Sequence, residues 1–155
     1  PMQGIIGALF QTGGFKREEQ EIREHGEKVL GFFGSRLVGY RLNQPASVLS
    51  YANRRRLEIA RAMATKPEVI LLDEPVAGMN PKESEELTGL IGKLRDEWGF
   101  TIVMIEHDMG VVRDVSDRVV VLDHGETIAQ GNYDEVSSNP AVIEAYLGRP
   151  AEEAS

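Results

Sequence analysis

The chain has 155 residues and a mass of 17.2 kDa, which is the size of one ordinary domain. Hydrophobic residues make up 41% and charged residues 27% of the sequence, a balance that excludes a disordered or fibrous protein. The net charge of −8 argues against a general nucleic-acid surface, and the absence of cysteine excludes disulfides and thiolate metal sites.

The first third of the sequence predicts helices. A helix over 16–33 carries four apolar residues at helical spacing on a charged background, and we expect all four to face a core: Ile22, Val29, Leu30 and Phe33. A second helix is predicted over 51–64, with Ser50 as its N-cap and its end before Pro67. The basic run 54–56 inside it is interpreted as a solvated helix face.

From residue 69 the pattern changes to strands alternating with helices. The run VILLD (69–73) predicts a buried strand. A helix follows, with Asn80 as N-cap, Pro81 at its first position and Glu83 completing a capping box. Its apolar residues repeat at the spacing of one helix face: Leu87, Leu90, Ile91, Leu94 and Trp98.

The remaining sequence continues this alternation. A strand FTIVMI (100–105) precedes a short helix that starts after Asp108, and two strands, RVVVLD (118–123) and ETIAQ (126–130), turn at His124-Gly125. A final helix spans NPAVIEAYLG (139–148), ended by Gly148. The order strand, helix, strand favours parallel pairing through a right-handed crossover, so we expect an α/β fold.

Acidic residues stand where the two parallel strands are predicted to end. Asp73 and Glu74 follow the first strand, and Glu106 and His107 follow the second. Ligands bind beyond the carboxyl ends of such strands, and an apolar strand that ends in Asp is the form in which P-loop NTPases hold Mg²⁺. Taken singly, an Asp-Glu pair is more often a strand end that meets solvent, and a lone histidine is more often structural. Strand type, order and spacing together favour a phosphate-transfer site.

These residues carry a resemblance to a known family. The stretches LSYANRRRLEIARAMATKPEVILLDEPVAGMNP (49–81) and TIVMIEHDM (101–109) resemble the ATP-binding subunits of ABC transporters, in which a signature LSGGQ, a magnesium strand, a D-loop and a switch histidine follow in this order. The match covers residues 45–130 well. It is most similar to subunits of branched-chain amino acid importers, which share RRLEIARA, AGxNP and NPxVIxAYLG.

The resemblance implies a P-loop NTPase-like fold and a role for each matched residue. Asp73 would coordinate Mg²⁺ through water, Glu74 would be the general base, and His107 would be the γ-phosphate switch. The signature and D-loop residues would contact ATP held by a second nucleotide-binding subunit of a dimer: Ser50, Tyr51, Ala52, Asn53, Gly78 and Asn80. The helices of residues 16–66 would face the membrane subunits of the transporter, which places the protein in the cytoplasm on the inner face of the cell membrane.

The sequence departs from the family in two respects. None of its 16 glycines fits G-x-x-x-x-G-K-[ST], and Gln11 lies too near Ser50 to serve as the glutamine of the family's glutamine loop. Since the chain also opens on Pro1, we expect it to be the C-terminal part of a longer nucleotide-binding domain. In the signature, Ala52 replaces a glycine and Asn53 a glutamine, which could weaken the contact with ATP.

Three functional interpretations remain. The first is the ATP-hydrolysing subunit of a branched-chain amino acid importer, with residues 1–66 as helical subdomain, 67–148 as partial ATPase core and 149–155 as tail. The phosphate-binding strand of that family would lie between strands 100–105 and 118–123, so we expect this chain to need a complementary segment or another copy, or to fold only marginally. Without the lysine and backbone contacts to the phosphates, the chain alone is predicted to be inactive. The second is a non-catalytic module that docks a membrane subunit or a full-length nucleotide-binding partner. The third, a chromosome-maintenance or repair ATPase, is disfavoured because those proteins carry long coiled-coil arms.

Overall fold

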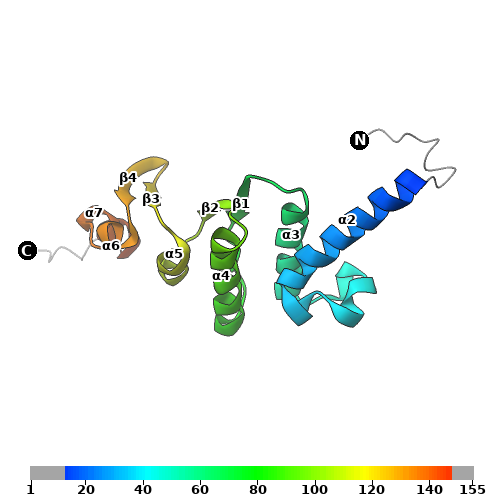
Figure 1. Cartoon of the computed structure of the whole chain (residues 1–155). Helices are drawn as coiled ribbons and strands as arrows, with labels where there is room; N and C mark the ends of the chain where they lie inside the picture. The colour runs from blue at the N-terminus through cyan, green and yellow to red at the C-terminus, as the bar shows by residue number, and fades with distance from the viewer. Residues whose placement is uncertain (1–12, 148–155) are drawn as a thin grey trace, which may run out of the picture.

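A computed structural model describes residues 13–147. The chain runs from one end of an elongated molecule to the other (Figure 1). Its elements are, in order, α2 (Gly13–Phe32), the short 3₁₀ helices η1 (Gly34–Arg36), η2 (Gly39–Asn43) and η3 (Ala46–Val48), α3 (Tyr51–Ala64), β1 (Val69–Asp73), α4 (Pro81–Asp96), β2 (Thr101–Ile105), α5 (Met109–Val115), β3 (Val119–Asp123), β4 (Glu126–Gly131), α6 (Tyr133–Ser137) and α7 (Pro140–Leu147).

The helix starts follow the capping chemistry predicted from the sequence. Ser50 caps α3, where its hydroxyl oxygen accepts a hydrogen bond from the Asn53 N–H. Asn80 and Glu83 form a reciprocal capping box at the start of α4. Asp108 caps α5 by accepting hydrogen bonds from two backbone N–H groups. Local capping chemistry therefore sets where α3, α4 and α5 begin, directly beside the predicted site residues.

Strands β1 and β2 pair in parallel, as expected, with Asp73 opposite Ile105 at the carboxyl end. One face of this sheet packs on α3 and α4, and the core there combines Ile70 and Leu72 with Met63, Leu87, Ile91 and Leu94. The expectation that the whole strand 69–73 is buried is wrong. Its side chains alternate, and Leu71 is 76% exposed on the uncovered face.

Strands β3 and β4 form a separate antiparallel hairpin. His124 and Gly125 both have positive φ angles at the predicted turn, as a two-residue hairpin loop of this twist requires. Helix α6, which the sequence analysis did not predict, and α7 pack against this hairpin, with Val136 and Val142 buried. The predicted end of the last helix at Gly148 and the predicted tail 149–155 lie outside the described residues, as does Gln11.

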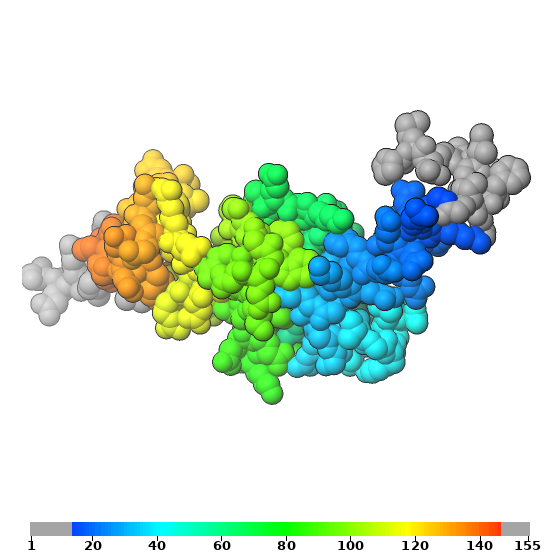
Figure 2. Space-filling view, viewed as in Figure 1, coloured from blue at the N-terminus to red at the C-terminus, as the bar shows by residue number. Residues whose placement is uncertain are grey.

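The two sheets are not joined to each other by hydrogen bonds in the described part of the chain. A cavity of about 470 Å³ lies between them, lined by residues from β2 and β3 such as Val103 and Val120. Figure 2 shows the same separation as a notch between the yellow segment and the green core. This gap lies where the sequence analysis expects the phosphate-binding strand. Among residues 13–147, no helix has the length and apolar character to span a bilayer.

Two further expectations need correction. Ile22 is 67% exposed rather than facing the core, since α2 extends past the body of the protein, whereas Val29 and Phe33 near its end are buried. The basic run on α3 is not a solvated face: only Arg54 is exposed, Arg55 is half-buried, and Arg56 is 1% exposed. The last two find partners on elements distant in sequence, which a local pattern does not reveal.

Candidate functional site

The carboxyl ends of β1 and β2 bring the predicted acidic residues and the histidine together. Asp73 is the last residue of β1, and Glu74 follows it at the sheet edge. The Nδ1 atom of His107 lies 3.3 Å from the Oε1 atom of Glu74, and both side chains are open to solvent. Parallel pairing makes this contact possible, because it places the residues after both strands at one edge.

The backbone of Glu74 turns sharply where the chain leaves the sheet. Its φ angle is +41°, in the left-handed region that a glutamate rarely adopts. Its N–H donates to the Ile105 carbonyl at 2.9 Å, which extends the parallel ladder by one residue, and its carbonyl accepts from the Ala77 N–H at 3.2 Å. This strained turn aims the side chain of Glu74 toward the end of β2.

Glu106, the other acidic residue at this edge, differs from Glu74 in its surroundings. Its Oε2 atom is buried and has no hydrogen-bond partner among the described residues. Burial raises the pKa of Glu106, and the Asp108 N–H and the charge of His107 oppose that rise only in part. Glu106 therefore favours its neutral form more than an ordinary glutamate does, and we assign it no role in activating water.

The start of α3 and the start of α4 lie side by side. Ser50 and Tyr51 are exposed, and the Tyr51 ring lies against Gly78, where an added Cβ would meet the ring carbon Cε1 at 3.7 Å. Gly78 has a φ of +73°, which explains why glycine suits this turn. Asn80 is occupied as the cap of α4. Four of the predicted signature and D-loop residues thus form one exposed patch: Ser50, Tyr51, Gly78 and Asn80.

Two predicted contact residues point elsewhere. Ala52 is 2% exposed, and Asn53 is also buried, with its side-chain oxygen accepting a hydrogen bond from Nη1 of Arg56 at 3.2 Å. In this structure the Asn53 side chain serves the packing of α3, and Ser50 and Tyr51 are the signature residues left at the surface.

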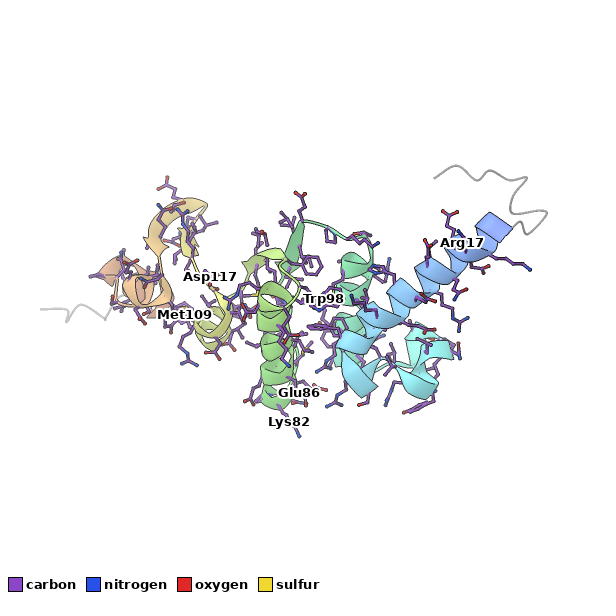
Figure 3. All side chains as sticks on the ribbon, viewed as in Figure 1. Arg17, Lys82, Glu86, Trp98, Met109 and Asp117 are labelled. Atoms are coloured by element: carbon purple, nitrogen blue, oxygen red, sulfur yellow. The ribbon has the colours of Figure 1, made fainter. Side chains whose placement is uncertain are left out.

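The structure adds three arginines that sequence reasoning did not connect with the site. Arg56 and Arg36 both bond Glu86, which projects from α4 in Figure 3, at 3.1 and 2.9 Å, and this network joins α3 and η1 to α4. Arg55 bonds the backbone at the end of β1. The adjacent arginines 54–56 were the available signal. However, the bonds of Arg55 to the end of β1 and of Arg56 to Glu86 span 18 or more residues and could not be read from the local pattern.

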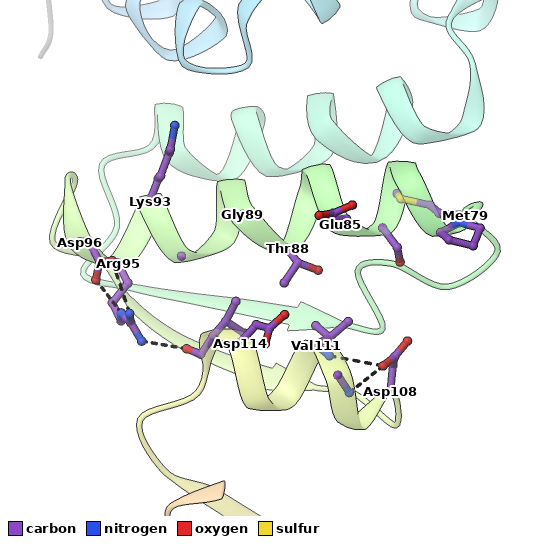
Figure 4. A pocket seen from close by; sticks show the side chains of 15 residues that line it. Met79, Glu85, Thr88, Gly89, Lys93, Arg95, Asp96, Asp108, Val111 and Asp114 are labelled. Carbon is purple, nitrogen blue, oxygen red and sulfur yellow. Dashed lines mark hydrogen bonds and ion pairs between the residues drawn. The ribbon is translucent and has the colours of Figure 1, made fainter.

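A groove of about 640 Å³ lies between α4 and α5 (Figure 4). Thr88, Gly89 and Val111 line it, and Arg95 bonds Asp96 and Asp117 at one end. Asp73, Glu74 and His107 do not line this groove. We therefore assign the chemistry to the shallow strand ends and not to this larger hollow.

A single carboxylate at the strand end fits a magnesium ion that is held mainly by other groups. Among residues 13–147, no cluster of three or more potential ligands is present. Mg²⁺ usually keeps several waters and binds through one or two carboxylates together with substrate phosphates. Asp73, exposed beside Glu74, meets that requirement, whereas a metal held by protein ligands alone does not fit here.

Comparisons with known proteins agree with these observations. Residues 3–77 match the family model described as ABC transporter, and residues 126–152 match that described as branched-chain amino acid ATP-binding cassette transporter. The high-affinity branched-chain amino acid transport ATP-binding protein BraF of Pseudomonas aeruginosa is 44% identical over 93% of this chain and 55% of its own length. LivG of Salmonella typhimurium is 45% identical over 94% of this chain. The chain spans about half the length of these relatives.

Solved structures give the same result for the fold. A nucleotide-free ATP-binding cassette from an ABC transporter superposes with a TM-score of 0.73 and 29% identity, over 96% of this chain and 58% of that one. The dimeric bacterial ABC transporter cassette MJ0796 gives a TM-score of 0.61 at 30% identity, over 74% of this chain and 48% of that one. The expected α/β fold of P-loop NTPase type, here with a small parallel sheet, is confirmed.

Proposed function

Because this chain belongs to the ABC transporter ATP-binding family, we propose that it supplies the metal-binding and water-activating part of a subunit that hydrolyses ATP to drive import of branched-chain amino acids. The observation that carries this proposal is the 3.3 Å contact between Glu74 and His107 at the ends of two parallel strands, directly beside Asp73. The names of BraF and LivG support the substrate class.

Each side chain of the strand-end site has a proposed task. Bound Mg²⁺ would neutralise and orient the phosphates of ATP. Asp73 would be the residue that holds this ion. Glu74 would accept a proton from the attacking water, since its exposed carboxylate lies at the strand end beside Asp73 and His107. His107 would orient both the Glu74 carboxylate and the γ-phosphate. The exposed patch faces ATP held by a second subunit and consists of Ser50, Tyr51, Gly78 and Asn80. The buried side chains of Ala52 and Asn53 support this patch through the packing of α3.

This chain supplies only part of the nucleotide site. Lysine and backbone contacts to the β- and γ-phosphates come from a phosphate-binding loop, which no glycine pattern in these 155 residues provides. We propose that a segment with such a loop adds a strand between β2 and β3, filling the cavity of about 470 Å³ and covering the exposed side chains of Leu71 and Val103. Alone, the chain binds no ATP at micromolar concentration and does not hydrolyse it.

The proposal extends to organisation and partners. We propose a division into a helical subdomain (1–66), a partial ATPase core (67–148) and a tail (149–155), of which the structure describes residues 13–147. The subunit pairs with a second nucleotide-binding subunit and docks on the membrane subunits of the transporter at the cytoplasmic face of the membrane. The dimeric cassette MJ0796 among the structural neighbours supports the first of these partners.

A complementation experiment tests this function. The chain is mixed with a segment carrying G-x-x-x-x-G-K-[ST] from the N-terminal half of BraF, and hydrolysis of Mg-ATP is measured. We expect activity with the native chain and a loss of about 10²-fold or more with Glu74→Gln. Glu97→Gln changes an exposed carboxylate at the end of α4 and is the matched control, with no expected effect. Activity that survives Glu74→Gln would contradict the proposed role of Glu74.

A second candidate is a binding module without catalysis, which the missing glycine pattern and the uncovered sheet face both favour. Such a module would dock a membrane subunit or a full-length nucleotide-binding partner. Co-purification with that partner, unchanged by Glu74→Gln, together with no hydrolysis in the complemented mixture, would support this alternative over the first.

A further inference from the structure

The side chain of Arg55 reaches from α3 to the end of β1. Its Nη2 atom donates to the backbone carbonyl of Asp73 at 3.0 Å and to that of Glu74 at 3.1 Å. Its Nη1 atom donates to Glu58 at 3.0 Å, which fixes the direction of the guanidinium group, and the side chain is 30% exposed. One half-buried cation thus bonds two successive carbonyls at the point where the chain leaves the sheet.

Those two carbonyls belong to the residues whose placement the site depends on. Glu74 adopts a left-handed conformation with φ of +41°, which is unfavourable for a glutamate unless its surroundings hold it. Its carbonyl also accepts from the Ala77 N–H, so Arg55 and the turn share one acceptor. A hydrogen bond from a charged donor is stronger than one between neutral groups, and here it favours the strained conformation.

The same helix begins at the signature serine. Ser50 caps α3, and Arg55 follows five residues later, about 7.5 Å along the helix axis. The 14-residue helix α3 is packed into the core through Ile59 and Met63, which makes it a rigid connection. Arg55 therefore gives α3 a direct bonded connection to the backbone of Glu74, in addition to the core packing of α3 on β1.

We propose that Arg55 is a positioning residue that couples the start of α3 to the carboxylate of Glu74 within one subunit. When Ser50 of one subunit contacts a phosphate held by a second subunit, Arg55 passes the resulting shift of α3 to Glu74. Glu74 is the proposed base for the nucleotide bound by the first subunit. This inference rests on the proposed function for its catalytic consequence, whereas the coupling itself is a property of the chain's own backbone.

The first measurement is site-resolved amide hydrogen exchange in the complemented protein, which requires no hydrolysis. Arg55→Gln keeps a side chain of similar length without its charge. We expect exchange at Glu74 and Ala77 to become about five- to tenfold faster, with exchange in α4 unchanged. Arg54→Gln is the matched control, because Arg54 is the exposed neighbour and its side chain has no bonded partner among residues 13–147.

Hydrolysis provides the second measurement. In the complemented protein, Arg55→Gln is expected to lower kcat about tenfold with KM for Mg-ATP within twofold of the native value, since Arg55 positions Glu74 and touches no nucleotide. Exchange at Glu74 and Ala77 that stays native, or that rises equally throughout α3, β1 and α4, overturns the proposal. If the native protein hydrolyses no ATP but exchange responds locally, the coupling stands and the proposed function fails instead.

Discussion

Two regions of the molecule differ in how they are held together. The body, residues 13–116, has one hydrophobic core that extends from Val29 to Val111 and joins α2, α3, α4 and both parallel strands. The hairpin region, residues 117–147, contains β3, β4, α6 and α7, and its buried residues Val136 and Val142 lie outside that core. Arg95 with Asp117 and Tyr146 with His107 connect the two regions.

This difference explains why the strand-end site is formed although the parallel sheet has only two strands among the described residues. Asp73, Glu74 and His107 are placed by pairing of β1 with β2 and by packing on α3 and α4, all of which lie in the body. The strand that we propose a partner segment adds would lie beside β2, at the junction between the two regions. In the proposed function, the residues assigned to water activation are thus already placed within the body, and a partner segment would supply the phosphate-binding half.

The largest expected effects are losses of stability, and they distinguish the body from the hairpin region. Leu94 is fully buried in the body, and Leu94→Ala should cost about 3 kcal/mol in the free energy of unfolding because it leaves a cavity among α4, β1 and β2. Val136→Ala should cost about 2 kcal/mol and should accelerate amide exchange only in residues 117–147. If Val136→Ala accelerates exchange in α4 equally, the two regions form one cooperative unit and the comparison is wrong.

How far the sequence predicts these regions depends on the range of the contacts. The capping box of α4 and its apolar residues Leu87 to Leu94 are encoded locally and were predicted correctly, although Trp98 lies past the end of this helix. The parallel pair β1–β2 was predicted correctly from the order strand, helix, strand. The exposure of Leu71 was not predicted, because the sequence VILLD has the same pattern whether or not a partner covers the second face of the sheet. The bonds of Arg55 and Arg56 were also missed, since their partners are set by the packing of α3 and not by its sequence.

The next expected effect concerns the ion network of the body. Arg56 is buried, and burial lowers its pKa against the opposing charge of Glu86. Arg56→Ala should cost about 2 kcal/mol, because it leaves Asn53 and Glu86 without that donor at the interface of α3 and α4. Thermal unfolding provides the measurement, with Arg54→Ala as control. Equal stability of the two variants would show that the network is not what holds α3 to α4.

A smaller effect is expected where the regions touch. The Tyr146 hydroxyl donates to the His107 carbonyl at 2.9 Å, and the Tyr146 side chain is largely exposed. Tyr146→Phe should cost no more than about 1 kcal/mol and should accelerate exchange two- to fivefold near residue 107 without affecting β1. The absence of any change near residue 107 would leave Arg95 with Asp117 as the bonded contact between the regions.

The smallest effect depends on pH. The pKa of Glu106 is raised above its ordinary value of 4.5 by burial, so the folded state binds this proton more tightly than the unfolded state. The contribution of Glu106 to the free energy of unfolding therefore does not change with pH below about 4.5. It decreases as pH rises from there through the pKa of Glu106 in the folded state. Glu106→Gln should raise Tm by about 1–3 °C at pH 7.5 and less at pH 4. The opposite pH dependence would show that Glu106 is stabilised as an anion.

The central claim is that this chain holds the metal-binding and water-activating half of a nucleotide site whose phosphate-binding half is separate. Calorimetric titration with Mg-ATP tests it most directly, first with the 155-residue chain and then with the chain plus the segment that carries the phosphate-binding loop. We expect no binding at micromolar ATP in the first case and stoichiometric binding in the second. Micromolar binding of ATP by the chain alone would contradict the claim.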